Sequence, residues 1–320
     1  MSLGKANLKV FAETLIELAR QDRDLLVVTS DSRGSAHLNR FAELFPQQLV
    51  EVGVAEQNLV GMAAGLAAAG KKVFAVSPAC FLTARALEQI KNDVAYSDHP
   101  VKLVGISAGV SYGALGSTHH SLHDFAVLRA IQNINIVAPA DNFESREAVK
   151  AAASYPHPIY LRFGKLPMFD LHGPASDFQL GKASVLREGG DLTFVAIGET
   201  VYPAWSAGLE LESRGISCRI ISMHTLKPLD VECLVEAAGA SRGLITVEEH
   251  SVYGGLGEAC AGILAQRRMD LPFRIVGFPD EPAVTGSQLE VFEHYGISTQ
   301  GLVETALQML GSCNASVSGA

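Results

Sequence analysis

A single carboxylate, Glu56, stands in the stretch "GVAEQNLVGMAAGLAAAG", directly before a long run of Ala, Gly, Leu, Val and Met. An acidic residue in the first turn of a helix commonly does no more than complement the helix dipole. This helix is so rich in Ala and Gly that we expect it to be packed on nearly all sides. Its N-terminus then lies in a crevice at the carboxyl end of the strand "LVEVG". A carboxylate held there is desolvated and can share a proton, which makes Glu56 a candidate for acid–base chemistry.

Three histidines, His119, His120 and His123, lie close together in "GALGSTHHSLHD". The i, i+4 spacing of His119 and His123 could form a metal pair, but that arrangement needs a third ligand and a helix beneath both residues. The glycine-rich approach places His119 in a loop instead, with Ser121 as an N-cap for the helix that follows. We therefore expect no metal ligand here, and a loop histidine that faces a substrate.

The elements that position these residues follow from short, β-branched apolar runs. The runs of the first half are "LLVVTS", "LVEVG", "KVFAVS", "VKLVGIS", "INIVAP" and "PIYLRF", and amphipathic helices are expected between them, for example over Leu82–Ala95 and Phe143–Ser154. Runs of this kind are typical of strands that are covered on both faces. The pattern predicts an α/β fold with a parallel sheet and helices on both of its faces.

The domain organisation follows from where this alternation breaks. We predict a first domain over residues 1–165, a Gly- and Pro-rich linker over 166–190, a smaller α/β domain over 191–310 and a disordered tail over 311–320. In the second domain the strands are "LTFVAIG", "SCRIIS", "GLITVEEH" and "FRIVGFP", and helices are expected over Val201–Arg214 and Leu256–Arg267. A chain of 320 residues has room for two such domains.

Composition narrows the classes of partner. The net charge of −9 argues against a nucleic-acid or anionic-membrane partner, since both require a basic face. The longest apolar run is broken by Gly and is too short to span a bilayer. Five cysteines without a C-x-x-C pair are typical of reduced thiols, and no signal peptide is evident, so we expect a cytoplasmic protein.

The order of motifs resembles a known family. The stretch from "EVGVAEQ" to "VGISAG", together with "GSTHH" and "PIYLRFGKLP", resembles the pyrimidine-binding domain of thiamine-diphosphate enzymes of the transketolase group. "MHTLKPLD" and "VEEHSVYGGLGEA" resemble the C-terminal domain of that group, so the resemblance covers residues 5 to 310 in order. It implies an enzyme that transfers a two-carbon ketol unit from a ketose phosphate to an aldose phosphate.

The resemblance implies roles for two residues at the cofactor. Glu56 matches the glutamate of the "G-x-x-E" turn, which hydrogen-bonds a ring nitrogen of the aminopyrimidine and favours the imino tautomer that removes the thiazolium proton. Phe81 matches the aromatic residue that stacks on the pyrimidine, whereas without the resemblance an ordinary core phenylalanine is the preferred interpretation. The family has a second aromatic residue three positions earlier, where this chain has Pro78.

The resemblance also implies substrate contacts. His119 matches the histidine that contacts hydroxyls near the reacting carbonyl, and His120 replaces the usual Gln. Arg162 stands where the family has a phosphate-binding arginine; the alternative for this residue is an ordinary ion pair. Ser35 is a weaker candidate for the same phosphate.

Two departures from the pattern bear on the sugar. Leu115 replaces an Asp that contacts a donor hydroxyl, and Ser107 replaces a phosphate-binding His. A lost hydrogen bond to a charged group costs about 1.5–3 kcal/mol. We therefore predict a donor other than xylulose 5-phosphate, such as the branched ketose apulose 4-phosphate or an anionic sugar analogue.

No "GDG" motif, which holds the cofactor's diphosphate and Mg²⁺ in this group, occurs in the sequence. We expect a partner subunit with that motif to bind thiamine diphosphate and Mg²⁺, so that the active site forms between subunits of an α₂β₂ assembly. Two alternatives remain open. One is the β subunit of a 2-oxo acid dehydrogenase, which has a similar "G-x-x-E" turn, and the other is a non-catalytic assembly protein that kept the fold.

Overall fold

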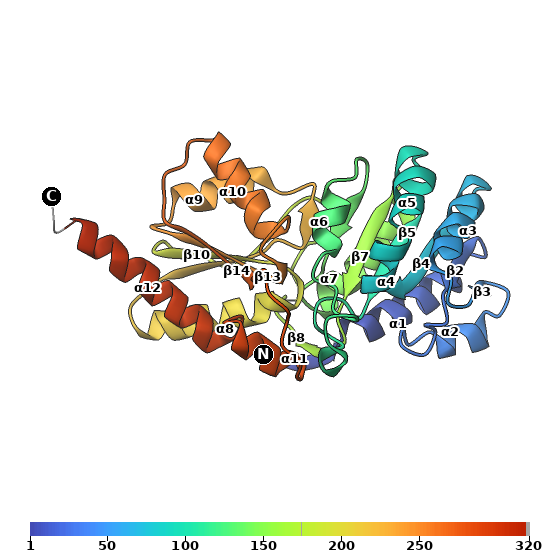
Figure 1. Ribbon diagram of the computed structural model, residues 1–320, viewed down its shortest axis with the longest axis horizontal. Coiled ribbons are helices and arrows are strands. Elements are labelled where there is room, and N and C mark those ends of the chain that lie inside the picture. The colour runs from blue at the N-terminus through green and yellow to red at the C-terminus, as the bar shows by residue number, and fades with distance from the viewer. Residues whose placement is uncertain (174, 318–320) are drawn as a thin grey trace.

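The structure is a computed structural model that describes residues 1–173 and 175–317. Figure 1 shows two α/β domains side by side, with the N-terminal half (blue to green) at one end and the C-terminal half (yellow to red) at the other. Within the described part of the chain, no helix is long and apolar enough to cross a membrane.

The first domain is built on a seven-stranded sheet with the order β12-β6-β7-β5-β4-β2-β3. Its strands are β2 (Leu25–Thr29), β3 (Leu49–Glu51), β4 (Lys72–Pro78), β5 (Lys102–Ile106), β6 (Asn135–Val137), β7 (Ile159–Phe163) and β12 (Thr225–Lys227). All neighbours are parallel except β12 and β6, which pair antiparallel. The six strands predicted from the apolar runs are therefore confirmed, and β12 is an addition from the second half of the chain.

Helices cover both faces of this sheet, as the sequence predicted. The helices are α1 (Asn7–Ala19), α2 (Asn39–Leu44), α3 (Glu56–Ala68), α4 (Ala79–Arg85), α5 (Leu87–Gln89), α6 (Asp124–Arg129) and α7 (Asn142–Ser154). One core cluster joins α1, α2 and α7 to the sheet, and another joins α3, α4 and α6 to its opposite face. The single helix expected over Leu82–Ala95 is wrong in detail, because α4 and α5 are followed by a π-helical segment, Ile90–Tyr96.

The second domain has a five-stranded sheet with the order β14-β13-β10-β11-β9. Its elements are β9 (Ser184–Arg187), β10 (Leu192–Ala196), β11 (Cys218–Ser222), β13 (Leu244–Ser251), β14 (Phe273–Phe278), α8 (Val201–Ser213), α9 (Val231–Gly239), α10 (Leu256–Gln266), α11 (Gln288–His294) and α12 (Thr299–Val317). The helices α8 and α12 pack on one face, and α9 and α10 on the other. One core cluster runs from α3 of the first domain to α10 of the second, so the two sheets share a continuous apolar interior.

The expected linker and tail contain more regular structure than predicted. Within 166–190, β8 (Pro167–Phe169) pairs antiparallel with β1 (Leu3–Ala6), and β9 forms an edge of the second sheet. Within 311–320, α12 continues to residue 317, while 318–320 lie outside the described residues. Both expectations rested on composition, which does not show pairing with a distant strand or the continuation of a helix.

Candidate functional site

The candidate site begins at the turn between β3 and α3. Gly53 has a φ of 74°, a left-handed conformation that favours glycine, and α3 starts three residues later at Glu56. The Glu56 side chain is only 5% exposed, and its Oε1 accepts a hydrogen bond from Arg85 Nη1 at 2.9 Å. Val54 to Asn58 and Arg85 line a cavity of about 540 Å³. A buried carboxylate thus lies at the wall of an open cavity.

The expectation that α3 is packed on nearly all sides is wrong for this chain by itself. Leu59, Val60 and Ala63 are buried against the sheet, but Gln57 and Met62 on the other side of the helix are exposed. The high Ala and Gly content therefore reflects one face buried within the chain and one small, smooth face left open. A face of this kind permits close approach of another protein surface.

Phe81 comes from another element and is connected to Glu56 through Arg85, which contacts both residues. It belongs to α4, which follows β4, and Pro78 ends β4 directly before that helix. The Arg85 guanidinium carbon lies 4.1 Å from the centroid of the Phe81 ring. The ring also meets His119 edge to face, with centroids 5.3 Å apart. The strand order places β4 and β3 on either side of β2, so helices that start after them meet at one edge of the sheet.

His119 lies in the loop between β5 and α6, as the sequence predicted. Its Nδ1 is 2.9 Å from Thr118 Oγ1, and its ring also contacts Tyr112, with centroids 5.5 Å apart. Lys165 Nζ lies 4.7 Å from the centroid of that tyrosine ring. The site therefore carries an exposed cation next to a half-buried histidine.

The other two histidines point elsewhere. His120 is buried, with Nε2 3.0 Å from the carbonyl oxygen of Gly113, and His123 Nε2 is 3.3 Å from Thr83 Oγ1. The prediction of Ser121 as an N-cap is wrong, since α6 begins at Asp124 and Ser121 forms a β-bridge with Gly109. Among residues 1–173 and 175–317, no group of three or more His, Cys, Asp or Glu side chains could hold a metal ion.

Arg162 does not reach the cavity. Its guanidinium is 5% exposed and donates to Asp124 Oδ2 at 2.8 Å, to Glu249 Oε2 at 3.3 Å, and to the backbone oxygens of Ser121 and Glu249. Burial by itself lowers the pKa of Arg162, but the two carboxylates outweigh it and hold that pKa above its ordinary value. This geometry fits the ion-pair alternative, and a buried arginine with all these acceptors is not available to a phosphate.

This ion-pair cluster holds both ends of the His119 loop. Glu249 Oε1 accepts from the backbone N–H of Val110 at 2.9 Å, while Arg162 donates to the Ser121 carbonyl. Gly109 allows this approach, because a Cβ there would lie 2.0 Å from the Glu249 carboxyl carbon. The second domain thereby fixes a loop of the first.

The remaining candidates are spread along the same edge of the sheet. Leu115 is 54% exposed, in a 3₁₀ turn of the His119 loop. Ser107 follows β5 with a φ of 51°, and its fully buried hydroxyl has no hydrogen-bond partner in the described structure. Ser35 is exposed in the segment after β2. Ser107 and Leu115 both belong to the loop between β5 and α6 that carries His119, with Ser107 buried at its start and Leu115 exposed within it.

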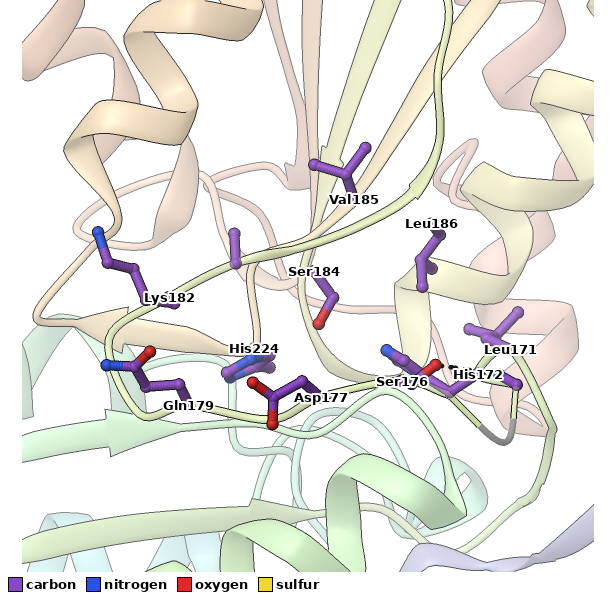
Figure 2. Close-up of a pocket in the computed structure, with 12 residues that line it drawn as sticks. Leu171, His172, Ser176, Asp177, Gln179, Lys182, Ser184, Val185, Leu186 and His224 are labelled. Atoms are coloured by element: carbon purple, nitrogen blue, oxygen red, sulfur yellow. Dashed lines mark hydrogen bonds between the residues drawn. The ribbon is translucent and has the colours of Figure 1, made fainter.

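A separate cavity of about 400 Å³ lies beside the linker, and its lining includes His172, Asp177 and Lys182 of the linker together with His224. Figure 2 shows His172, Asp177 and His224 among the side chains that line it. His172 Nδ1 is 2.9 Å from Asp141 Oδ2, and burial lowers the pKa of His224 to about 3. It shares no lining residue with the Glu56 cavity. The Glu56 cavity remains the candidate site, because contacts through Arg85 connect its buried carboxylate to the Phe81 ring, which in turn meets the half-buried His119.

Sequence reasoning missed Arg85, Tyr112 and Lys165. Arg85 lies four residues after Phe81 on one helix, a spacing that places both side chains on one face and could have been noticed. Tyr112 and Lys165 come from different loops, so only the fold brings them together.

Comparisons with known proteins agree with this arrangement. Residues 4–168 match the pyrimidine-binding domain of transketolase, and residues 181–302 match the transketolase C-terminal domain. A Phocaeicola vulgatus protein, named as one of the subunits of an apulose-4-phosphate transketolase, is 50% identical over 303 residues, covering 94% of this chain and 96% of that protein. A Clostridium sp. subunit of 6-deoxy-6-sulfo-D-fructose transketolase is 34% identical and covers 92% of each chain.

A solved structure of a split-gene transketolase, an inactive β4 tetramer, matches with a TM-score of 0.87 at 35% identity, covering 96% of this chain and 99% of that one. These relatives do not favour the 2-oxo acid dehydrogenase or the non-catalytic alternative. With both domains matched in order and half of the residues shared with a transketolase subunit, the chain belongs to the thiamine-diphosphate-dependent transketolase family.

Proposed function

We propose that this chain is the pyrimidine-binding subunit of a split transketolase, which together with its partner subunit transfers a two-carbon ketol unit from a ketose phosphate to an aldose phosphate. The observation that carries this proposal is the buried Glu56 carboxylate at the wall of an open cavity, with Phe81 and His119 in contact beside it. This combination provides a proton acceptor, a stacking surface and a polar group within one site.

The residues present fit the aminopyrimidine end of thiamine diphosphate. A 5% exposed carboxyl group needs a hydrogen-bonding partner, and a pyrimidine ring nitrogen can share a proton with it. Thiamine diphosphate supplies the carbanion chemistry of the family when it is bound. Glu56 would hold a proton at its carboxyl oxygen against the pyrimidine, Phe81 would pack on the ring, and His119 would hydrogen-bond a substrate hydroxyl near the reacting carbonyl.

The diphosphate and Mg²⁺ belong, in this proposal, to a partner subunit with a "GDG" motif in an α₂β₂ assembly. Two observations support a partner: the open, small-residue face of α3, and relatives that are themselves named as subunits over nearly their whole length. The cysteines whose side chains are described, Cys80, Cys218, Cys233 and Cys260, are free thiols, which supports a cytoplasmic location.

Lys165 takes over the phosphate role that the resemblance implies for Arg162. It is exposed three residues further along the chain and lies on the Tyr112 ring that contacts His119. A lysine binds phosphate as a mobile point charge, which suits an open site. Arg162 keeps the structural role described above.

The donor is proposed to be a sugar phosphate other than xylulose 5-phosphate, with apulose 4-phosphate as the first candidate. The similarity to the Phocaeicola vulgatus protein and the exposed apolar Leu115 on the His119 loop support this choice. An aspartate there could accept a hydrogen bond from a donor hydroxyl, and leucine cannot.

Reconstitution tests the assignment. The purified chain, mixed with thiamine diphosphate, Mg²⁺ and a ketose phosphate, is expected to give no ketol transfer, and addition of the "GDG" subunit is expected to start it. The partner alone serves as the control. Full transfer by this chain alone would refute the split arrangement, and no transfer by the mixture over a panel of donors would refute the activity.

Donor choice is tested by Leu115→Asp in the reconstituted enzyme. We expect kcat/KM for xylulose 5-phosphate to rise about tenfold relative to that for apulose 4-phosphate, the effect of one hydrogen bond to a charged group. Leu289→Asp changes another exposed leucine, on α11 of the second domain, and should leave the ratio unchanged. A parent enzyme that already prefers xylulose 5-phosphate contradicts the role of Leu115.

A further inference from the structure

Arg85 occupies a particular place in the candidate site. It touches the two residues to which the cofactor ring is assigned, through an ion pair to Glu56 at 2.9 Å and through the face of the Phe81 ring at 4.1 Å. Its side chain is 49% exposed, and it lines the cavity together with Glu56. The guanidinium therefore covers one face of the Phe81 ring and pairs with the buried Glu56 carboxylate at the same time.

The guanidinium and the aminopyrimidine present the same chemistry to these two residues. Both are flat and both can hydrogen-bond a carboxyl group: the guanidinium donates N–H groups to it, and the aminopyrimidine shares a proton with it at a ring nitrogen. Both also stack on an aromatic face. Two flat groups cannot lie on one face of Phe81 and use the same Glu56 oxygen together, so one must leave when the other binds.

We propose that Arg85 holds the place of the pyrimidine ring in the chain without cofactor and moves out when the cofactor binds. This proposal rests on the proposed function, since it takes Glu56 and Phe81 as the residues that receive the ring. Arg85 acts as a positioning residue: it keeps the Glu56 carboxylate paired and the Phe81 face covered until the ring replaces it.

The energetics permit such an exchange. A buried carboxylate without a partner is costly, so a paired Glu56 is favoured in the free chain. Arg85 is half exposed, its ion pair is partly screened by water, and its long side chain can turn into solvent. The contact that is lost is therefore weak enough for a bound ring to replace it.

If Arg85 instead stayed in place and added a contact to the bound cofactor, removing Arg85 would change the affinity for the ring in the opposite direction. Removing a competitor tightens binding of the ring, and removing a contact weakens it. We expect Arg85→Met to bind thiamine, which carries the aminopyrimidine without the diphosphate, about three- to tenfold more tightly than the parent chain. Methionine keeps an unbranched side chain of moderate length but offers no hydrogen-bond donor.

The experiment is a titration of thiamine into the isolated chain, followed by NMR. Arg40→Met is the matched control, because Arg40 forms only an exposed ion pair with Glu43 on α2. Arg85→Lys keeps the charge without the flat fork, and its affinity is expected between those of Arg85→Met and the parent. If the lysine variant binds no more tightly than the parent does, charge repulsion accounts for the effect and the proposal is overturned.

The proposal is also overturned if Arg85→Met binds thiamine no more tightly than the parent chain does, or if neither chain binds it.

Thermal unfolding of the isolated chain gives the second readout. Arg85→Met is expected to lower the Tm by about 2–4 °C, and this loss should disappear in a Glu56→Gln background. Neither measurement uses the partner or ketol transfer, so a failure of the proposed activity is distinguishable from a failure of this inference.

Discussion

Two arginines, Arg85 and Arg162, have similar neighbours but differ in exposure and in the number of their hydrogen-bond acceptors. Each pairs with a buried carboxylate and lies over a phenylalanine ring, at 4.1 Å from Phe81 and at 4.7 Å from Phe125. Arg162 is 5% exposed and has two carboxylates and two backbone oxygens as acceptors, whereas Arg85 is 49% exposed. The number of partners and the access of water therefore decide whether such an arginine is a fixed part of the fold or a group that can move.

The two regions are also connected. The Arg162 cluster fixes the ends of the loop that carries His119, and His119 contacts the Phe81 ring that Arg85 covers. A rigid, fully paired cluster at the domain junction thus supports an open, incompletely paired site next to it. Polar groups at a functional site are commonly left for a ligand to complete, while buried structural ones are satisfied within the chain.

The largest loss of unfolding free energy is expected when the Arg162 cluster is broken. Arg162→Met leaves Asp124 and Glu249 as buried carboxylates without their main partner, and such losses cost about 3–5 kcal/mol of unfolding free energy. Arg85→Met removes a half-exposed pair and should cost about 1 kcal/mol or less. Urea unfolding of both variants measures the difference. Equal losses of unfolding free energy in the two variants would contradict the distinction between a structural Arg162 and a weakly held Arg85.

A second test concerns the acidic side of the same cluster. Glu199 and Glu249 both accept a hydrogen bond from Gln288 Nε2, at 2.6 and 2.8 Å. Burial raises the pKa of both carboxyls above the ordinary value of 4.5, and the neighbouring carboxyl raises that of Glu199 further. The folded chain therefore binds more protons than the unfolded chain above the ordinary carboxyl pKa.

The sign of the pH effect follows from this difference. The unfolding free energy falls as the pH rises from about 4.5 through the raised pKa values, by up to about 1.4 kcal/mol per pH unit for each group. Glu199→Gln cannot ionise and should remove one such contribution, so its unfolding free energy declines less steeply between about pH 5.5 and 8.5. Parallel declines in parent and variant, measured by urea unfolding, would mean that Glu199 does not titrate in this range.

A smaller effect is expected at the open site. Lys165→Met removes the exposed cation beside Tyr112, and we expect KM for a phosphorylated donor to rise about tenfold with little change in kcat, since a uniform binding contact is lost. Lys150→Met, on α7, removes a lysine paired on the surface with Glu147 and is the control. An unchanged KM would remove Lys165 from the substrate phosphate.

Much of the fold could be predicted because long, β-branched runs have few alternatives to a strand covered on both faces. The strands that were missed, β1, β8, β9 and β12, have three or four residues each and lie at edges, where pairing with a distant segment decides their structure. The break in the helix after α4 was also missed, since the sequence pattern there continues without a Gly or Pro.

The site was predictable to the extent that motifs place residues at the ends of neighbouring parallel strands. The structure brings Glu56, Phe81 and His119 together in this way, while their roles stay predictions. The resemblance assigned Arg162 to phosphate, and the sequence did not show its acceptor Glu249, which lies 87 residues away. Arg85 was missed for the same reason: its partner Glu56 lies 29 residues earlier on another helix.

The central claim is that Glu56 provides the proton contact to the cofactor. The most direct test uses the reconstituted enzyme with the substitution Glu56→Gln. It measures hydrogen–deuterium exchange at the reactive carbon of thiamine diphosphate. An amide cannot share the proton, so we predict that exchange slows by about 10²-fold or more. Thermal unfolding of the variant shows that it is folded, and calorimetric titration shows that it binds the cofactor. Exchange at the rate of the parent enzyme, in a variant that is folded and loaded with cofactor, would contradict the account.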